Sequence, residues 1–561
     1  MNPAQTQKLP GIRMGLIGGV CLVILALIGI VEAFNERHIV AGVISMGHTL
    51  LLLTAAFVAY LTAARSRHLG FGRALGHVLL AGLIMSAMLA LLVLVGRAVN
   101  LRQVFINASP GLYQILMFHQ ESLAAGIALL LVAGLLTSFL AGLLHVAPQR
   151  LRRVLITALL GIVVVGLLQD LLQPILGVWA PLATMSGWLF EVSGLSLAGA
   201  LGLAVLVAAV TALWSRQSAA VRARIQSLAP DRQRNLKWAA ILIGLAVLLV
   251  LPGVLGIFLS EVLTIIGLYV LLGLGLNIVV GFAGLLDLGY VAFFAIGSYT
   301  VAILTSPEIG AYQLSFWQAL PVAVVLGTLA GALLGIPVLK MRGDYLAITT
   351  LGFGEIIRIL VLSDVLRPWL GGAQGIARIP KASILGFEFS GPQEIYYLLI
   401  AGCFLVGFVS WRLRDSRLGR AWMAMREDED VAQAMGINLV STKLLAFATG
   451  AGFSALSGAI FATKLGSVYP HSFNVMISIN ILCLIIVGGM GSMPGVIVGA
   501  VALVGLPELL REFAEYRLLV YGAALVAMML LRPEGLWPEA MRKRELHDNL
   551  NGTGQPDAPR G

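Results

Sequence analysis

The residues of this sequence best suited to chemistry are a few charged side chains set within long apolar runs. Glu355 and Arg358 lie three residues apart, so they share one face of a predicted helix and can pair. Intramembrane charges are costly unless they have a partner or a task. A structural ion pair and a group that lines or gates a transport path therefore both fit. Asp287 follows a break at Gly281 and Gly284, is expected at a span end near water, and is a further candidate for lining or gating the transport path.

A second concentration of charge lies between two apolar runs, in residues 412–438. It starts with basic residues, continues through an acidic cluster from Glu427 to Asp430, and has a helix-forming run that ends at Gly436. Glycine is a common helix stop. A short amphipathic helix of this kind suits docking in a groove of a soluble partner. An ordinary charged loop that fixes topology fits the composition equally well.

Glycines interrupt several apolar runs and mark places where membrane helices break or pack closely. Gly488, Gly489 and Gly491 belong to a glycine-rich stretch without the lysine of a phosphate-binding loop. We interpret this stretch as a helix-packing break between two spans. Asn277 favours an interhelical hydrogen bond and is also a candidate for the transport path.

Motifs of enzymes and of metal sites are missing from the sequence. It contains no GxxxxGK[ST], GxSxG, HExxH or CxxC pattern. Cys21, Cys403 and Cys483 lie in apolar runs and are interpreted as packing residues. The chain is therefore expected to be no enzyme, to have no metal site and to bind no cofactor itself.

The elements that position these residues follow from composition. The chain has 561 residues, of which 59% are hydrophobic and 11% charged, and its mean hydropathy is +0.94. Soluble domains are about 25% charged, so a soluble enzyme, a disulfide scaffold and a nucleic-acid binder are excluded. An all-α polytopic transmembrane bundle is expected, because a helix of about 20 apolar residues spans the bilayer.

About sixteen apolar runs are long enough to be considered as spans, six before a polar stretch and ten after it. They lie near 14–31, 40–63, 74–95, 121–144, 154–173, 196–214, 238–259, 262–281, 285–304, 316–339, 345–363, 395–411, 444–463, 476–489, 494–510 and 517–531. The first run is interpreted as a retained helix. Most of the 37 basic residues fall in segments that a cytoplasmic N-terminus would place inside, so both termini are expected in the cytoplasm.

This pattern predicts four parts. Residues 1–214 form an N-terminal membrane extension of about six helices, and 215–237 form a basic cytoplasmic linker that is suited to the lipid surface. Residues 238–540 form the second membrane domain, and 541–561 form a polar cytoplasmic tail.

A set of short motifs occurs in one order through the second membrane domain. They are Gly273-Leu-Gly-Leu-Asn-Ile-Val-Val-Gly281, Gly284-Leu-Leu-Asp-Leu-Gly-Tyr290, Phe294-Ala-Ile-Gly-Ser-Tyr299, Arg342-Gly-Asp-Tyr-Leu-Ala-Ile-Thr-Thr-Leu-Gly-Phe-Gly-Glu-Ile-Ile-Arg-Ile359, Gly371-Gly-Ala-Gln-Gly-Ile376, Leu418-Gly-Arg-Ala-Trp422, Arg426-Glu-Asp-Glu429, Ala434-Met-Gly436, Val487-Gly-Gly-Met-Gly-Ser492 and Arg532-Pro-Glu-Gly-Leu536. By this ordered set, residues from about 238 to 540 resemble the LivM-type permease subunit of bacterial branched-chain amino acid ABC importers.

The resemblance implies an importer of leucine, isoleucine or valine in the bacterial inner membrane. Its other parts would be a second permease similar to LivH, two cytoplasmic ATPases that bind ATP and Mg²⁺, and a periplasmic amino acid-binding protein. It further implies that residues 420–436 are the loop that couples to the ATPase. The residues matched to that loop are Arg420, Arg426, Glu427, Asp428, Glu429, Ala434 and Gly436.

Two departures from the family pattern leave alternatives open. The outer loop reads Leu370-Gly-Gly-Ala-Gln-Gly-Ile376 where the family often has Thr-Gly-Gly-Pro-Asn-Gly-Ile, and family members usually have fewer N-terminal spans. Urea, a short amide or another amino acid is an alternative substrate. An ion-coupled secondary transporter with sites in broken helices is a second alternative. Membrane lipid is an expected contact and nucleic acid is not.

Overall fold

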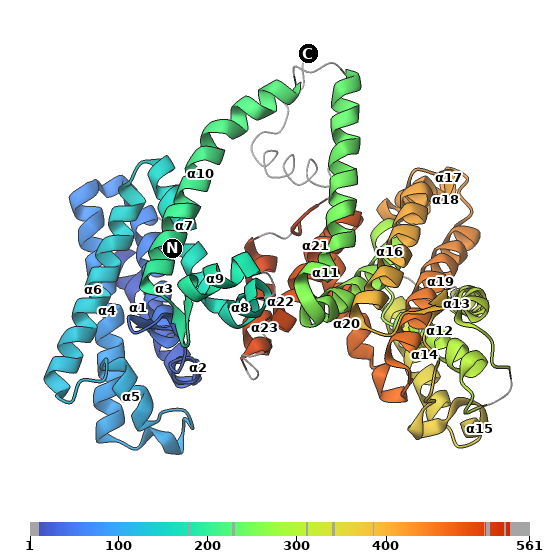
Figure 1. Ribbon diagram of the computed structural model, residues 1–561, viewed down its shortest axis with the longest axis horizontal. Helices are drawn as coiled ribbons and strands as arrows, with labels where there is room; N and C mark the ends of the chain where they lie inside the picture. The colour runs from blue at the N-terminus through green and yellow to red at the C-terminus, as the bar shows by residue number, and fades with distance from the viewer. Residues whose placement is uncertain are drawn as a thin grey trace, which may run out of the picture. The chain divides into compact units, whose positions relative to one another are not determined.

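The computed structural model describes residues 10–177, 180–226, 230–309, 312–338, 341, 343–384, 386–509, 511, 516–531 and 534–538. These residues are mostly helical, as expected, and contain two small sheets that the sequence did not predict. The chain divides into two compact units, Met1–Ile241 and Leu242–Gly561. In Figure 1 the first unit runs from blue to green and the second from green to red.

Unit 1 is built on four long helices that pack on one another. They are α1 (Pro10–Leu27), α3 (Met46–Arg65), α4 (Phe71–Ala98) and α6 (Leu123–Val146). Small residues allow the close approach: the face of Gly18 meets Val58 and Met85, and Gly82 packs on Ser138. Ser45 and Ser122 accept backbone N–H groups at the starts of α3 and α6, so local capping fixes where these helices begin.

Unit 1 also contains further helices, of which α10 is the longest. They are α2 (Ile30–Ala33), α5 (Pro110–Leu116), α7 (Gln149–Leu167), α8 (Gln169–Gly177), α9 (Ala180–Leu189) and α10 (Leu197–Gln226), with 3-10 turns η1 (Arg67–Leu69) and η2 (Leu101–Gln103). A four-stranded sheet in the order β2-β1-β4-β3 joins distant parts of this unit. Its strands are β1 (His38–Val40), β2 (Ile44–Ser45), β3 (Phe190–Glu191) and β4 (Gly194–Leu195).

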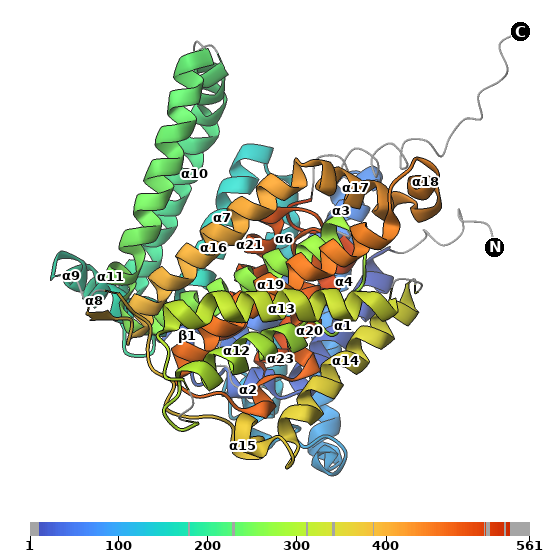
Figure 2. The same ribbon diagram turned by 90° about the vertical axis from the view of Figure 1, so that its right-hand side faces the viewer.

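Unit 2 has its core where α12, α13 and α19 pack together. Figure 2 shows α12 and α13 beside α19. Glycines of all three helices lie at these contacts. Gly297 and Gly327 face Ala455, and Gly458 lies against the Phe294 carbonyl. A Cβ at these positions would overlap the neighbouring helix, which is why small residues stand there.

The elements of unit 2 follow in chain order. They are α11 (Pro230–Leu276, which begins in unit 1), the π-helix η3 (Asn277–Phe282), α12 (Val291–Thr305), α13 (Phe316–Val338), α14 (Asp344–Leu362), α15 (Arg367–Leu370), η4 (Gly372–Gln374), β5 (Ser383–Ile384), β6 (Phe387–Glu388), α16 (Pro392–Arg414), α17 (Arg417–Glu427), α18 (Glu429–Ala434), α19 (Leu439–Leu465), η5 (Pro470–Ser472), α20 (Val475–Gly488), α21 (Met493–Ala500), the π-helix η6 (Val501–Gly505), α22 (Leu506–Leu509) and α23 (Arg517–Leu531).

The described residues contain 11 helices long and apolar enough to cross a membrane, or 12 if the bent pair α7 and α8 is one span. The predicted count of about sixteen is not confirmed. The runs near 238–259 and 262–281 form a single helical stretch, Leu242–Phe282, which kinks at Gly256 where φ is 76°. The helices near 285–304, 494–510 and 517–531 are shorter than a full span.

The predicted linker, residues 215–237, is helical at both of its ends. α10 continues to Gln226 and α11 begins at Pro230. The division between the two units falls after Ile241. The predicted tail, residues 541–561, lies outside the described residues. The structure therefore extends helices from both membrane domains into the stretch that composition marked as polar.

Candidate coupling and translocation site

The charged segment of residues 412–438 folds as two short helices, α17 and α18, between the long helices α16 and α19. Ser416 starts α17 by accepting the Gly419 backbone N–H at 3.2 Å. Asp428 both ends α17 and starts α18, because its carboxylate accepts the N–H groups of Asp430 and Val431 at 2.9 and 3.0 Å. The Ser416 cap thus sets where α17 begins, and the Asp428 cap sets the bend between the two helices.

The inner face of this helix pair is anchored in the core of unit 2. The side chain of Trp422 is fully buried, and its Nε1 donates to the Thr442 carbonyl at 2.8 Å. Met425 is also buried. The ammonium of Lys443, only 3% exposed, pairs with Glu429 at 2.9 Å. These contacts hold α17 and α18 against the start of α19.

The opposite face of the pair is open. Glu427 and Ala434 are exposed, and Val431 and Met435 expose 58% and 79% of their surfaces. Gly436 ends the element with φ of +87° and has no neighbouring atoms within 4 Å of a Cβ position. Its glycine therefore serves the turn and not close packing. An apolar tip rimmed by carboxylates is a surface that suits a partner protein.

Arg426 connects the helix pair to the first break in the membrane helices. Its Nη1 donates to the carbonyl of Gly281 at 2.5 Å, within the π-helix η3. The backbone of Gly284, at φ +71°, lies against the aliphatic stem of the same arginine. Arg420, by contrast, is exposed, and its Nη1 donates to the nearby Asp415 carbonyl. One predicted coupling residue is thus integrated into the core and another stays on the surface.

The two glycine breaks meet at Asn277. This side chain is 1% exposed, and its Oδ1 accepts the backbone N–H of Gly491 at 2.9 Å. The Gly281 Cα also packs on Asn277 and on the Gly491 nitrogen. π-helical turns such as η3 are frequent at functional sites and come at the cost of regular helix geometry. The structure shows Asn277 in a hydrogen bond between separate segments, as its sequence context suggested.

The second glycine break holds the end of the described chain. Residues beyond α23 form backbone hydrogen bonds with this break. The Trp537 N–H donates to the Gly488 carbonyl at 2.9 Å, and the Leu536 N–H donates to the Val487 carbonyl at 2.8 Å. Gly489 adopts φ of +117°, a conformation that only glycine takes readily. The motif that starts at Val487 and the motif that ends at Leu536 are thus joined by backbone hydrogen bonds, which the sequence alone did not indicate.

Asp287 lies in an extended, buried stretch between η3 and α12. It is fully buried, and its Oδ1 accepts the Gly289 backbone N–H at 2.9 Å. Its Oδ2 has no hydrogen-bond partner among the residues the structure describes. The next residue, Leu288, donates its backbone N–H to Thr350 on α14 at 3.0 Å. The expectation that Asp287 lies near water is wrong, because the chain folds back into the core here and buries its side chain.

Glu355 and Arg358 form an ion pair on α14 at 2.8 Å, with 34% and 36% of their side chains exposed. They share α14 with exposed apolar residues such as Ile348 and Ile359, and Gly352 has no atoms within 4 Å of a Cβ position. The pair therefore does not face the interior of this chain. Because an ion pair is costly against lipid, this face of α14 calls for a protein or aqueous neighbour.

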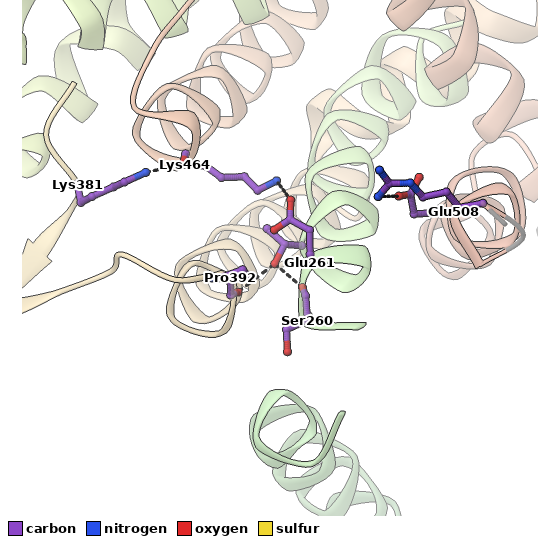
Figure 3. Close-up of polar contacts among 8 residues, drawn as sticks. Ser260, Glu261, Lys381, Pro392, Lys464 and Glu508 are labelled. Carbon is purple, nitrogen blue, oxygen red and sulfur yellow. Dashed lines mark hydrogen bonds and ion pairs between the residues drawn. The ribbon is translucent and has the colours of Figure 1, made fainter. Parts of the chain in front are cut away.

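A row of polar contacts fastens the loop between α14 and α16 to the membrane helices (Figure 3). Lys464, at the end of α19, pairs with Glu261 on α11 at 2.6 Å, and its carbonyl accepts the Lys381 ammonium at 2.6 Å. Thr264 donates to the Pro392 carbonyl at 3.2 Å. Burial lowers the pKa of Lys381, and the positive charge of Lys464 lowers it further.

The same loop carries the glycine motif that departs from the family pattern. Gly371, Gly372 and Gly375 all have positive φ, and Gly375 packs directly on the Val468 carbonyl. Ile376 and Val468 exchange backbone hydrogen bonds at 2.9 and 2.8 Å. The loop is thus built into the end of α19 and is not a loose connection.

Sequence reasoning missed several residues of this site. Trp422 and Lys443 anchor the helix pair, and Thr350 holds the stretch beside Asp287. A weak signal existed for Lys443, which directly precedes the apolar run near 444–463. Trp422 belongs to a short motif, but its sequence context did not predict that it anchors the helix pair. In the described part of the chain, no group of three or more His, Cys, Asp or Glu side chains could hold a metal ion.

Comparisons with known proteins agree with this architecture. The family described as "Branched-chain amino acid transport system / permease component" matches residues 258–529, which lie in unit 2. The chain is 43% identical over 301 residues to the high-affinity branched-chain amino acid transport system permease protein LivM of Escherichia coli K12, covering 50% of this chain and 69% of that protein. The LivM protein of Salmonella typhimurium is 44% identical over the same lengths.

A second kind of relative is more distant. The permease protein LivH of Salmonella typhimurium is 25% identical over 284 residues, covering 48% of this chain and 90% of that protein. No solved structure matches the chain. The matched region holds the helix pair α17–α18, both glycine breaks and the α14 ion pair. The chain, a multi-pass membrane protein, therefore belongs to the family of branched-chain amino acid transport permease components.

Proposed function

We propose that the chain is the membrane-spanning permease subunit of an ATP-driven ABC importer of leucine, isoleucine or valine. The substrate assignment is supported by the names of the relatives, which are branched-chain amino acid permeases. In this proposal a periplasmic binding protein delivers the amino acid, two cytoplasmic ATPases bind ATP and Mg²⁺, and this chain binds no cofactor and catalyses no reaction itself.

One observation carries the mechanism: α17 and α18 have a buried inner face and an open apolar tip. Trp422 and the pair of Lys443 with Glu429 fix the helices to α19. Arg426 fixes them to the break at Gly281. Movement of an ATPase seated on Met435 and Val431 would therefore reach the membrane helices through hydrogen bonds and packed side chains. Ligands shift such equilibria only through contacts that differ between two states.

A second permease similar to LivH is the proposed neighbour of α14. Beyond its first turn, the exposed face of α13 is apolar, with Val325, Leu329 and Leu333 outward, and suits lipid. The exposed face of α14 instead includes the partly buried ion pair of Glu355 and Arg358. A translocation path between two permeases would accommodate this pair, because the path holds water and partner side chains.

The proposed orientation places both termini and the α17–α18 pair in the cytoplasm, within the bacterial inner membrane. The support is the excess of lysine and arginine in the segments that this orientation places inside. The domain assignment of residues 1–214, 215–237, 238–540 and 541–561 is part of the same proposal. The N-terminal extension lies outside the matched family region and is proposed to serve assembly rather than transport.

Charge reversal tests the docking surface. Asp428 is unsuitable because its carboxylate caps α18, so its loss would disturb the fold. Glu427→Arg changes only an exposed side chain next to the apolar tip. The matched control is Arg417→Glu, an exposed residue at the start of α17 on the far end of the pair. Glu427→Arg should lower transport and stimulated ATPase activity with the complex intact, and full activity would exclude this surface.

The alternative of an ion-coupled secondary transporter is tested by uptake into proteoliposomes. The π-helix η3 and the glycine loop favour this alternative, because secondary transporters bind substrate and ions at broken helices. The importer predicts leucine uptake only when the second permease, both ATPases and ATP are present. Uptake by this chain alone under a proton or sodium gradient would support the alternative. Parallel assays with urea and short amides test the alternative substrates.

A further inference from the structure

Unit 1 contains a cavity of about 540 Å³ that the proposed function does not use. It lies where α3 and α6 end and α4 and α7 begin, and every residue that lines it belongs to unit 1. Its volume is within the roughly 300–1,000 Å³ typical of small-molecule sites. Much of the wall is apolar, from side chains such as Leu75 and Val78, and Phe71 and Val146 at its edge are 55% and 56% exposed.

The polar part of the wall includes two cationic side chains, Arg67 and Arg152. They line the cavity together with His145, and Arg152 donates to the His145 carbonyl at 3.4 Å. In the described part of the chain neither arginine pairs with a carboxylate. The sequence explains this, because α3, α4, α6 and α7 contain no aspartate or glutamate. The Nδ1 atom of His145 is buried and has no hydrogen-bond partner among the described residues.

Two helices direct their N-termini at the same cavity. α4 begins at Phe71 and α7 at Gln149, and both residues line the wall. The preceding residues, Gly70 and Pro148, provide no side-chain cap. The first backbone N–H groups of a helix lack partners within it, and their positive dipole ends favour a bound anion. The cavity thus combines unpaired arginines, a histidine and uncapped helix starts, without a balancing negative charge from the surrounding helices.

We propose that this cavity binds a phosphate-bearing ligand with an apolar portion, of which the headgroup of an anionic membrane lipid is the best fit. The phosphate would lie between Arg67 and Arg152, and the acyl chains would leave along the exposed apolar edge at Phe71 and Val146. Basic pockets between membrane helices are known binding sites for anionic lipid headgroups. The site would link the N-terminal extension to membrane composition, which goes beyond transport itself.

Native mass spectrometry of the full chain in detergent tests the proposal directly. The probes are phosphatidylglycerol, phosphatidylcholine and inorganic phosphate at equal concentrations. The variants are Arg67→Gln, Arg152→Gln and the matched control Arg153→Gln, an exposed arginine beside Arg152 that does not line the cavity. Each cavity variant should weaken phosphatidylglycerol binding about five-fold, and both together roughly 25-fold, from the contribution of one arginine near an anionic lipid.

The controls separate the sources of the anion. Preference for phosphatidylglycerol over phosphatidylcholine, lost in the two cavity variants and kept in Arg153→Gln, supports a lipid site. Equal binding of inorganic phosphate with the same dependence on Arg67 and Arg152 supports a phosphate site for a soluble ligand. Equal loss in Arg153→Gln, or no lipid preference in the unmodified chain, overturns the proposal. The lipid preference is measured on the unmodified chain, so misfolding of a variant cannot hide its absence.

Discussion

Arg426 offers the sharpest test of how a push on α17 would reach the membrane. Its guanidinium donates to the Gly281 carbonyl at 2.5 Å, and its stem packs on Gly284. Glutamine at this position is shorter and uncharged, so Arg426→Gln loses this hydrogen bond. A hydrogen bond from a charged donor contributes about 1.5–3 kcal/mol. If this contact is made in only one state of the transport cycle, its loss shifts the equilibrium by about 10- to 100-fold.

The assay is ATP-dependent leucine uptake by the assembled importer in proteoliposomes, with basal ATPase activity measured on the same preparation. Arg426→Gln should reduce uptake about 10- to 100-fold while the complex still assembles and hydrolyses ATP. Arg417→Gln is the control, because Arg417 is an exposed arginine at the start of α17, at the far end of the helix pair from Arg426. Normal uptake by Arg426→Gln, or an equal loss in Arg417→Gln, would refute the reasoning.

Other predictions concern the anchoring of the same helix pair. Trp422→Ala should lower the free energy of unfolding by about 3–5 kcal/mol, because a fully buried ring is lost. In the same thermal unfolding assay, Trp411→Ala should change this free energy little, because Trp411 is 51% exposed. Lys443→Met should destabilise by about 1–3 kcal/mol, less than a fully buried pair, because Glu429 keeps 19% exposure to water. Gly436→Ala should cost about 1–2 kcal/mol from its φ of +87° alone, and an unchanged melting temperature would contradict that strain.

The sequence predicted the elements with strong local signals. The long apolar runs form helices, and Gly436 stands two residues after the end of α18. Glu355 and Arg358 pair as their spacing indicated, since residues three apart share a helix face. These features depend on neighbours in sequence, which is why periodicity and turn chemistry were enough to find them.

What the sequence could not predict depends on distant contacts. The bond from Arg426 to the Gly281 carbonyl joins residues 145 positions apart, and Asn277 meets Gly491 across 214 positions. The stretch around Asp287 seemed suited to a span end, and the structure buries it because long-range packing on α14 overrides local composition. The predicted span count is not confirmed, because two of the predicted runs meet at the non-helical Gly256 and three others form helices shorter than a full span.

The central claim is that the open tip of α17–α18 contacts an ATPase subunit. A photo-crosslinking residue at Met435, which is 79% exposed, tests this contact in the assembled importer. Ile106, which is 81% exposed in unit 1, is the matched control position. The proposal predicts an adduct between position 435 and the ATPase, with a yield that changes when ATP is added, and none from position 106. An importer that assembles and transports without any adduct at position 435 would contradict the claim.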